Sequence, residues 1–191
     1  MINKKEFKAI REELENYDKQ REVLIKESRT LLKLSKQIIY SVHRGNMEET
    51  EELLKDARDE KAKLDKITRR AESLSMEHSY SDALQEYTEA LCYSGFVSSK
   101  KLPSRKTIGV NSEDYLMGLC DLTGELGRRA VSLATKRKFK EVEAIKKLVE
   151  DIYGEFLKFN LRNSSLRKKS DSIKWNLKKI EEIMYDLRKH H

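Results

Sequence analysis

A heptad pattern at the start of the chain constrains its fold more than any other feature. Apolar residues recur there at alternating steps of four and three, at Ile10, Leu14, Tyr17, Leu24, Leu31, Ile38 and Val42. This seam predicts one helix of roughly 50 Å at about 1.5 Å per residue, which needs neighbouring helices along its whole length. Arg21, Ser28 and Ser35 occupy polar slots of the seam. Arginine is costly in a dry core, so Arg21 either reaches an acid or lines a wet interior surface.

The composition extends this helical prediction to the whole chain. One proline, seven glycines and 38% charged residues favour long helices with few breaks. We therefore expect an all-α bundle of about six or seven helices, formed by one domain over residues 1–191. There is no run of eighteen apolar residues and no apolar segment of a signal peptide, so we expect a cytoplasmic protein without a membrane partner.

Breaks in the pattern divide the chain into further helices. Gly45 and Asn46 end the first helix, and helices are expected over 47–74, 79–98, 112–129, 140–159 and from 166 onward. Residues 100–111 contain Pro103 and are expected to form a loop, after which Ser112 caps the next helix. The last helix has its own heptad seam, which is typical of a dimerisation element; the seam comprises Leu166, Ile173, Leu177, Ile180, Met184 and Leu187.

Two pairs of acidic residues are the candidate catalytic and metal-binding groups. Asp121 and Glu125 lie one turn apart beside an apolar stripe, and a lone pair of this kind is more often solvated surface. Glu86 and Glu89 form a second pair on a helix that is apolar on two sides and therefore packed on two sides. The connecting loop makes these two helices neighbours, so their acidic faces can meet.

Four converging carboxylates would raise one another's pKa until a proton or cation neutralises them. Oxygen ligands without thiol or imidazole favour Mg²⁺, Mn²⁺ or Ca²⁺ over zinc or copper, and we read His43 and His78 as isolated and Cys92 and Cys120 as core residues. A bound Mg²⁺ or Mn²⁺ can activate water and neutralise a phosphate, which phosphodiester hydrolysis requires. Arg128 and Arg129, one turn past the second acidic pair, could stabilise the developing charge.

Basic residues suggest a polyanionic partner. The net charge is +7, and residues 158–180 contain eight basic residues against one acid. On the first helix a basic stripe has the one-sidedness expected of phosphate contacts, although such stripes are more often solvated surface; it consists of Lys26, Arg29, Lys33 and Lys36.

Three motifs resemble the translin and translin-associated factor X (Trax) family. They are EYTEA at 86–90, DYLMGLCDLTGEL at 114–126 and LRNSSLRKKSDSIKWNLKKIEEIMYDL at 161–187, and residues 21–46 are also similar to the family's first helix. The likeness covers most of the chain and is nearest to a prokaryotic, archaeal-type Trax-like protein. It implies an all-α fold that assembles into closed, barrel-like octamers with nucleic acid inside.

The resemblance also implies an activity and its residues. The Trax branch is implied to be a metal-dependent endoribonuclease acting on single-stranded RNA. Its catalytic and metal-binding acids would fall on Glu86, Glu89, Asp121 and Glu125, and its basic RNA contacts on Arg21, Arg167 and Lys168.

Three functional hypotheses follow. The leading one is a Mg²⁺- or Mn²⁺-dependent endoribonuclease that prefers single-stranded RNA, with duplex RNA as a further substrate. It would work as a homo-oligomer, either an octamer or its dimer or tetramer building block, and a translin-like chain is a further expected partner. The second is a non-catalytic, translin-type protein that binds single-stranded RNA or DNA. The third is a structural helical oligomer whose acids pair with Arg and Lys across interfaces.

Overall fold

The computed structural model describes residues 2–162 and 164–189, and within these ranges it contains helices and connecting turns but no strand. The all-α prediction is confirmed. None of the described helices is both long and apolar enough to cross a membrane. The elements are α1 (Lys4–Arg44), α2 (Met47–Arg70), the 3₁₀ helix η1 (Glu72–Met76), α3 (His78–Ser99), α4 (Arg105–Ile108), α5 (Ser112–Thr135), α6 (Phe139–Phe156) and α7 (Ser165–Lys189).

The helix ends follow local capping chemistry. Gly45 ends α1 with φ of 75°, a left-handed conformation that glycine adopts without a Cβ penalty. Asn46 begins α2, because its side chain accepts a hydrogen bond from the Glu49 backbone N–H. Several expected boundaries are wrong: α5 continues to Thr135 rather than ending at residue 129, and α6 ends at Phe156 rather than at residue 159. Helix α2 ends at Arg70 and the chain continues as η1, the expected loop over 100–111 contains the short α4, and Asn111 rather than Ser112 caps α5.

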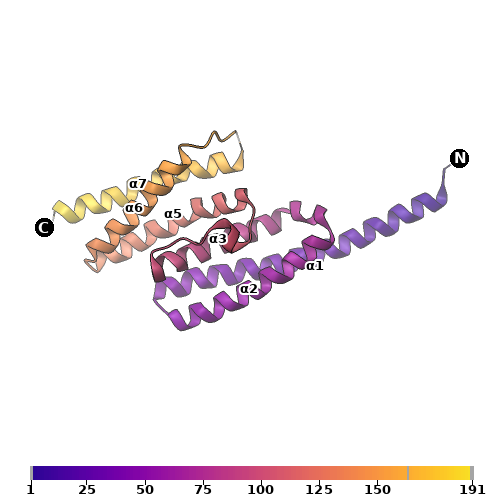
Figure 1. Cartoon of the computed structure of the whole chain (residues 1–191), viewed down its shortest axis with the longest axis horizontal. Coiled ribbons are helices and arrows are strands. Elements are labelled where there is room, and N and C mark those ends of the chain that lie inside the picture. Colours follow the sequence, from indigo (N-terminus) through magenta and orange to yellow (C-terminus); the bar gives the residue numbers. More distant parts are fainter. Residues whose placement is uncertain (1, 163, 190–191) are drawn as a thin grey trace.

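Only the C-terminal part of the α1 seam is covered by the chain's own helices. Leu24, Leu31 and Ile38 are fully buried, whereas Ile10 and Leu14 are exposed. Figure 1 shows the N-terminal part of α1 extending beyond the other helices. At the transition, the Arg21 Nε donates to Glu77 Oε1 at 2.8 Å, so Arg21 reaches an acid.

The helices form two groups that meet along α3 and α5. Helix α1 packs on α2 and α3, while α5 packs on α6 and α7, and α3 contacts α5 (Figure 1). The α7 seam is buried inside the chain, with Ile173 and Ile180 fully covered. The prediction that this seam serves dimerisation is therefore wrong, because α5 and α6 already cover it. Cys92 and Cys120 are buried and unpaired, as expected for core residues.

The contact between α3 and α5 depends on a glycine. A Cβ at Gly118 would lie 2.7 Å from the Gln85 backbone oxygen and 2.7 Å from Thr88 Cβ, closer than real Cβ contacts allow. Gln85 directly precedes Glu86 and Thr88 directly precedes Glu89 in the sequence, and Gly118 lies one turn before Asp121. The close approach at this glycine therefore sets the distance between the two acidic helices.

We expect Gly118→Ala to destabilise the protein, because the added methyl group must push α3 away from α5. Overpacking of this kind costs about 1–3 kcal/mol. Gly127→Ala is the matched control, since a Cβ at this position of α5 meets nothing within 4 Å and alanine favours a helix interior by roughly 0.5–1 kcal/mol. Urea unfolding measures both variants. Equal stabilities for the two would contradict this account of the α3–α5 contact.

Candidate active site

The structure brings the four predicted carboxylates together between α3 and α5. Glu89 is only 6% exposed, and its pKa is raised to about 9, first by burial and then by the charges of Asp121, Glu86 and Glu125. Burial also raises the pKa of Glu86, to which Asp121 and Glu125 again contribute. Each pair that the sequence placed on a separate helix thus lies within the electrostatic field of the other.

Helix α7 supplies a cation to this cluster. Lys169 Nζ lies 2.5 Å from Asp121 Oδ2 and also donates to Gln85 Oε1 at 3.2 Å. Burial raises the pKa of Asp121, and Lys169 opposes that shift. Lys169 therefore ties α7 to both acidic helices. Lys169 directly follows Arg167 and Lys168, for which nucleic-acid contacts were predicted, but no sequence pattern indicated its contact with Asp121.

Helix α1 supplies a histidine. His43 Nε2 contacts Glu125 Oε2, and His43 Nδ1 lies 3.0 Å from the Tyr93 hydroxyl. The pKa of Glu125 is lowered, chiefly by His43 and further by Arg128, whose Nη1 is 3.6 Å from the same oxygen. When Nε2 donates to the carboxylate, Nδ1 of the same ring is free to accept the Tyr93 O–H. Tyr93 therefore orients the histidine, and the histidine orients Glu125.

His43 is the main residue that sequence reasoning missed. We read it as isolated, because Glu125 lies 82 residues further along the chain. The available signal was its position in the last turn of α1, directly after the buried seam residue Val42.

The donor chemistry of the cluster fits a hard divalent cation. All four groups offer carboxylate oxygens, and their shared negative charge favours a positive ion. In the described part of the chain, no three His, Cys, Asp or Glu side chains are already arranged around one ion position. Asp121 is instead held by Lys169, so a bound cation would compete with this ion pair, whereas His43 contacts Glu125 through one carboxylate oxygen, Oε2.

The basic stripe of α1 leads to the carboxylates. Lys26, Arg29, Lys33 and Lys36 are exposed, and none of them pairs with an acid in the described ranges. Lys36 lowers the pKa of Glu86, which places this end of the stripe beside the cluster. These side chains are thus open to a polyanion next to the acidic site.

The other predicted nucleic-acid contacts lie in different settings. Arg129 is half-buried beside Tyr93 and lowers the pKa of its hydroxyl, against the larger effect of burial. Arg167 and Lys168 are exposed in the first turn of α7, where Arg167 Nε is 3.8 Å from Asp171. Arg21 is committed to Glu77. The stripe, Arg167 and Lys168 therefore remain more accessible than Arg21 and Arg129.

Comparisons with known proteins match most of the chain. The model of the Translin family matches residues 19–189. Translin of Gallus gallus is 41% identical over 75 residues, which are 39% of this chain and 33% of that protein, so the match spans about a third of the relative's length. The translin-associated protein X homolog of Schizosaccharomyces pombe is 28% identical over 199 residues, covering 94% of this chain and 86% of that protein.

A solved structure of similar fold is an AfC3PO–duplex RNA complex. It has a TM-score of 0.85 and 26% sequence identity to this chain, and the alignment covers 97% of this chain and 98% of the AfC3PO chain. The similarity therefore extends over the whole arrangement of helices.

We expect Glu89→Gln to stabilise the metal-free protein, increasingly so as the pH rises. The folded-state pKa of about 9 lies above the ordinary value of 4.5. Between these two pH values, Glu89 is protonated in the folded state and ionised in the unfolded state. Stability from this group is complete below about 4.5 and falls as the pH rises towards about 9. Glutamine removes this dependence.

Urea unfolding in EDTA, over this pH range, measures the effect. Glu143→Gln on the exposed side of α6 is the control and should follow the parent protein. If Glu89→Gln and the parent lose stability in parallel with rising pH, Glu89 does not carry the proton.

Proposed function

The chain belongs to the translin family, and on this premise we propose that it is a Mg²⁺- or Mn²⁺-dependent endoribonuclease that cleaves single-stranded RNA. The observation that carries the proposal is the gathering of Glu86, Glu89, Asp121 and Glu125 beside the exposed basic stripe of α1. Buried carboxylates with raised pKa are costly in a folded protein, and such groups cluster at functional sites.

RNA binding is proposed from the charge pattern and from the relatives. The exposed stripe from Lys26 to Lys36 ends at the carboxylates, and its four charges are all positive, which suits a nucleic-acid phosphate backbone. The similar AfC3PO structure is a complex with duplex RNA. We propose single-stranded RNA as the preferred substrate and duplex RNA as a further ligand. The phosphate backbone would run along the stripe towards Glu86.

The four carboxylates would hold the divalent cation. When bound, Mg²⁺ or Mn²⁺ supplies Lewis-acid chemistry that neutralises phosphate charge and activates water. The chain's own residues orient this site: His43 holds Glu125, and Lys169 holds Asp121 until a cation replaces it. Lys36 and Arg128 lie beside the acids and would contact the phosphate next to the scissile bond.

Assembly into a closed homo-oligomer is proposed to enclose the site. We propose an octamer, built from dimers or tetramers, and a translin-type chain as a further partner. Exposed apolar side chains on α1 and α7 offer surface for such contacts; they include Phe7, Ile10, Leu14, Trp175 and Tyr185.

Glu125→Gln is expected to remove RNA cleavage while RNA binding remains, since the change removes one acidic ligand and little shape. The loss should exceed the roughly 10–100-fold that an outer partner of a metal site costs. Asp82→Asn is the matched control, because Asp82 lies exposed on α3 outside the cluster. Labelled single-stranded RNA with Mg²⁺, Mn²⁺ or excess EDTA gives the readout. Cleavage that persists in EDTA or in Glu125→Gln would refute the nuclease proposal.

If the parent protein binds RNA but cuts none with either metal, the translin-type binding protein is the correct reading. That alternative also predicts strongly salt-dependent binding without a metal requirement.

His43→Ala is expected to lower the affinity for the metal by roughly 10–100-fold, because Glu125 loses the group that orients it. The measurement is the Mn²⁺ concentration that gives half-maximal cleavage. His78→Ala is the control, since His78 is exposed at the start of α3. Equal Mn²⁺ requirements for both variants would show that His43 has no positioning role.

A further inference from the structure

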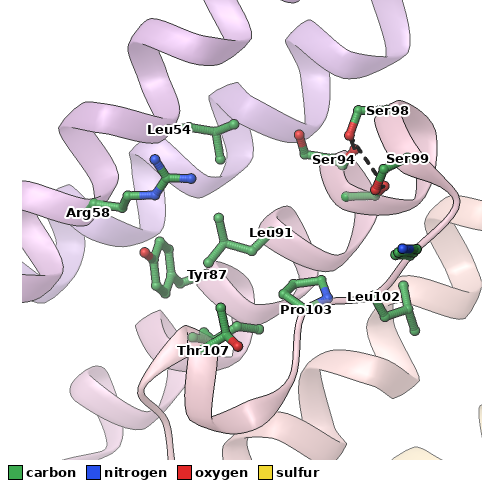
Figure 2. Close-up of a pocket in the computed structure, with 13 residues that line it drawn as sticks. Leu54, Arg58, Tyr87, Leu91, Ser94, Ser98, Ser99, Leu102, Pro103 and Thr107 are labelled. Atoms are coloured by element: carbon green, nitrogen blue, oxygen red, sulfur yellow. Dashed lines mark hydrogen bonds between the residues drawn. The ribbon is translucent and has the colours of Figure 1, made fainter.

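A cavity lies on the other side of α3 from the carboxylates. Its volume is about 400 Å³, within the range of small-molecule sites. Figure 2 shows it between α2, α3 and the segment that leads into α4. Tyr87, Leu91, Ser94 and Ser98 of α3 face this cavity, at a helical spacing that turns them away from the acidic cluster. It is therefore separate from the proposed nuclease site.

Backbone contacts fix the walls of this cavity. A Cβ at Gly95 would lie 2.8 Å from the Lys101 backbone oxygen, so glycine lets the segment after α3 fold back against the helix. The Tyr115 hydroxyl donates to the Pro103 oxygen at 3.0 Å, and buried Lys61 donates to the Gly109 oxygen at 2.9 Å. The cavity is thus preformed and does not depend on a loose loop.

Two hydroxyls of buried residues lack partners there. Tyr87 is 3% exposed and Ser94 is 6% exposed, yet neither side-chain oxygen makes a hydrogen bond with a described residue. Within the described ranges, the side-chain oxygens that have neither a hydrogen-bond partner nor contact with solvent belong to Ser28, Glu60 and Ser79. The oxygens of Tyr87 and Ser94 are not among them, so they are not sealed off. The Tyr87 and Ser94 oxygens therefore open into the cavity, where a ligand could satisfy them.

The cavity also has a cationic end. Arg58 has no acid within ion-pair distance in the part of the chain that the structure describes, and its charge lowers the pKa of Tyr87 against the larger effect of burial. Figure 2 shows Arg58 and Tyr87 at one end and the serines at the other, with Leu91 and Pro103 between. Ser98 and Ser99 already donate to backbone oxygens, so their hydroxyls remain as acceptors.

We propose that this cavity binds a mononucleotide, with its phosphate at Arg58 and Tyr87 and its base towards the serines. A guanidinium suits a phosphate group, because its fork of donors can bind two oxygens. The apolar middle suits a flat base, and Ser94 with its neighbours offers donors and acceptors for the polar edge. A plain alkyl chain fits poorly, since the serine hydroxyls would lose solvent without gaining partners.

Isothermal titration of the purified full-length protein with nucleoside 5′-monophosphates, in EDTA, tests this site. We expect saturable binding, and the matching nucleoside or inorganic phosphate should bind at least about 10-fold more weakly. Arg58→Gln should weaken nucleotide binding by about 10–100-fold through loss of a charged hydrogen bond. Arg69→Gln is the matched control, because Arg69 is exposed on the same helix outside the cavity.

Tyr87→Phe should weaken binding to a smaller degree, and Glu125→Gln should leave it unchanged because the two sites are separate. Absence of saturable binding to the parent protein would overturn the proposal. So would equal affinities in Arg58→Gln and Arg69→Gln, or nucleoside or phosphate binding as tight as that of the nucleotide. Far-ultraviolet circular dichroism of each variant shows that it is folded.

Discussion

The close approach of α3 and α5 at Gly118 is the contact on which the rest of the structure depends. It joins the α1–α2–α3 group to the α5–α6–α7 group, and it leaves no room for a Cβ between the helices. The same approach forces the two acidic pairs together in a partly buried space. Glycine at position 118 therefore allows the connection between the two helix groups. It also allows the close approach of the carboxylates, which contributes to the raised pKa of Glu89.

Side chains from distant parts of the chain offset that electrostatic cost. Lys169 of α7 holds Asp121, His43 of α1 holds Glu125, and Glu89 is left with a strongly raised pKa. A site of this kind destabilises the metal-free fold, since like charges are buried beside one another. Proteins tolerate such strain where it serves function, which is the physical reason for preferring a metal-dependent activity over a purely structural role for the acids.

Helix α3 carries residues of both proposed sites, the carboxylate cluster and the cavity beside α2. It is buried along most of its length, so polar residues on both of its faces are enclosed by neighbours. One face presents Glu86 and Glu89 to α5, and the other presents Tyr87 and Ser94 to the cavity beside α2. The two faces differ in the sign of their charge: the first carries the carboxylates, whereas the second ends at the guanidinium of Arg58. Anionic ligands would therefore approach the two faces for different reasons.

The sequence by itself determined the all-α class, most helix ends and the placing of each acidic pair on one helical face, because these depend on local periodicity and capping. Tertiary structure decided the rest. Periodicity shows which face of a helix is apolar but not which helix covers it, so the α7 seam packs inward and the start of α1 stays exposed. Likewise the partners of Glu125 and Asp121 come from helices far away in the chain. Such pairs arise only when helix packing brings their side chains together, which no local pattern encodes.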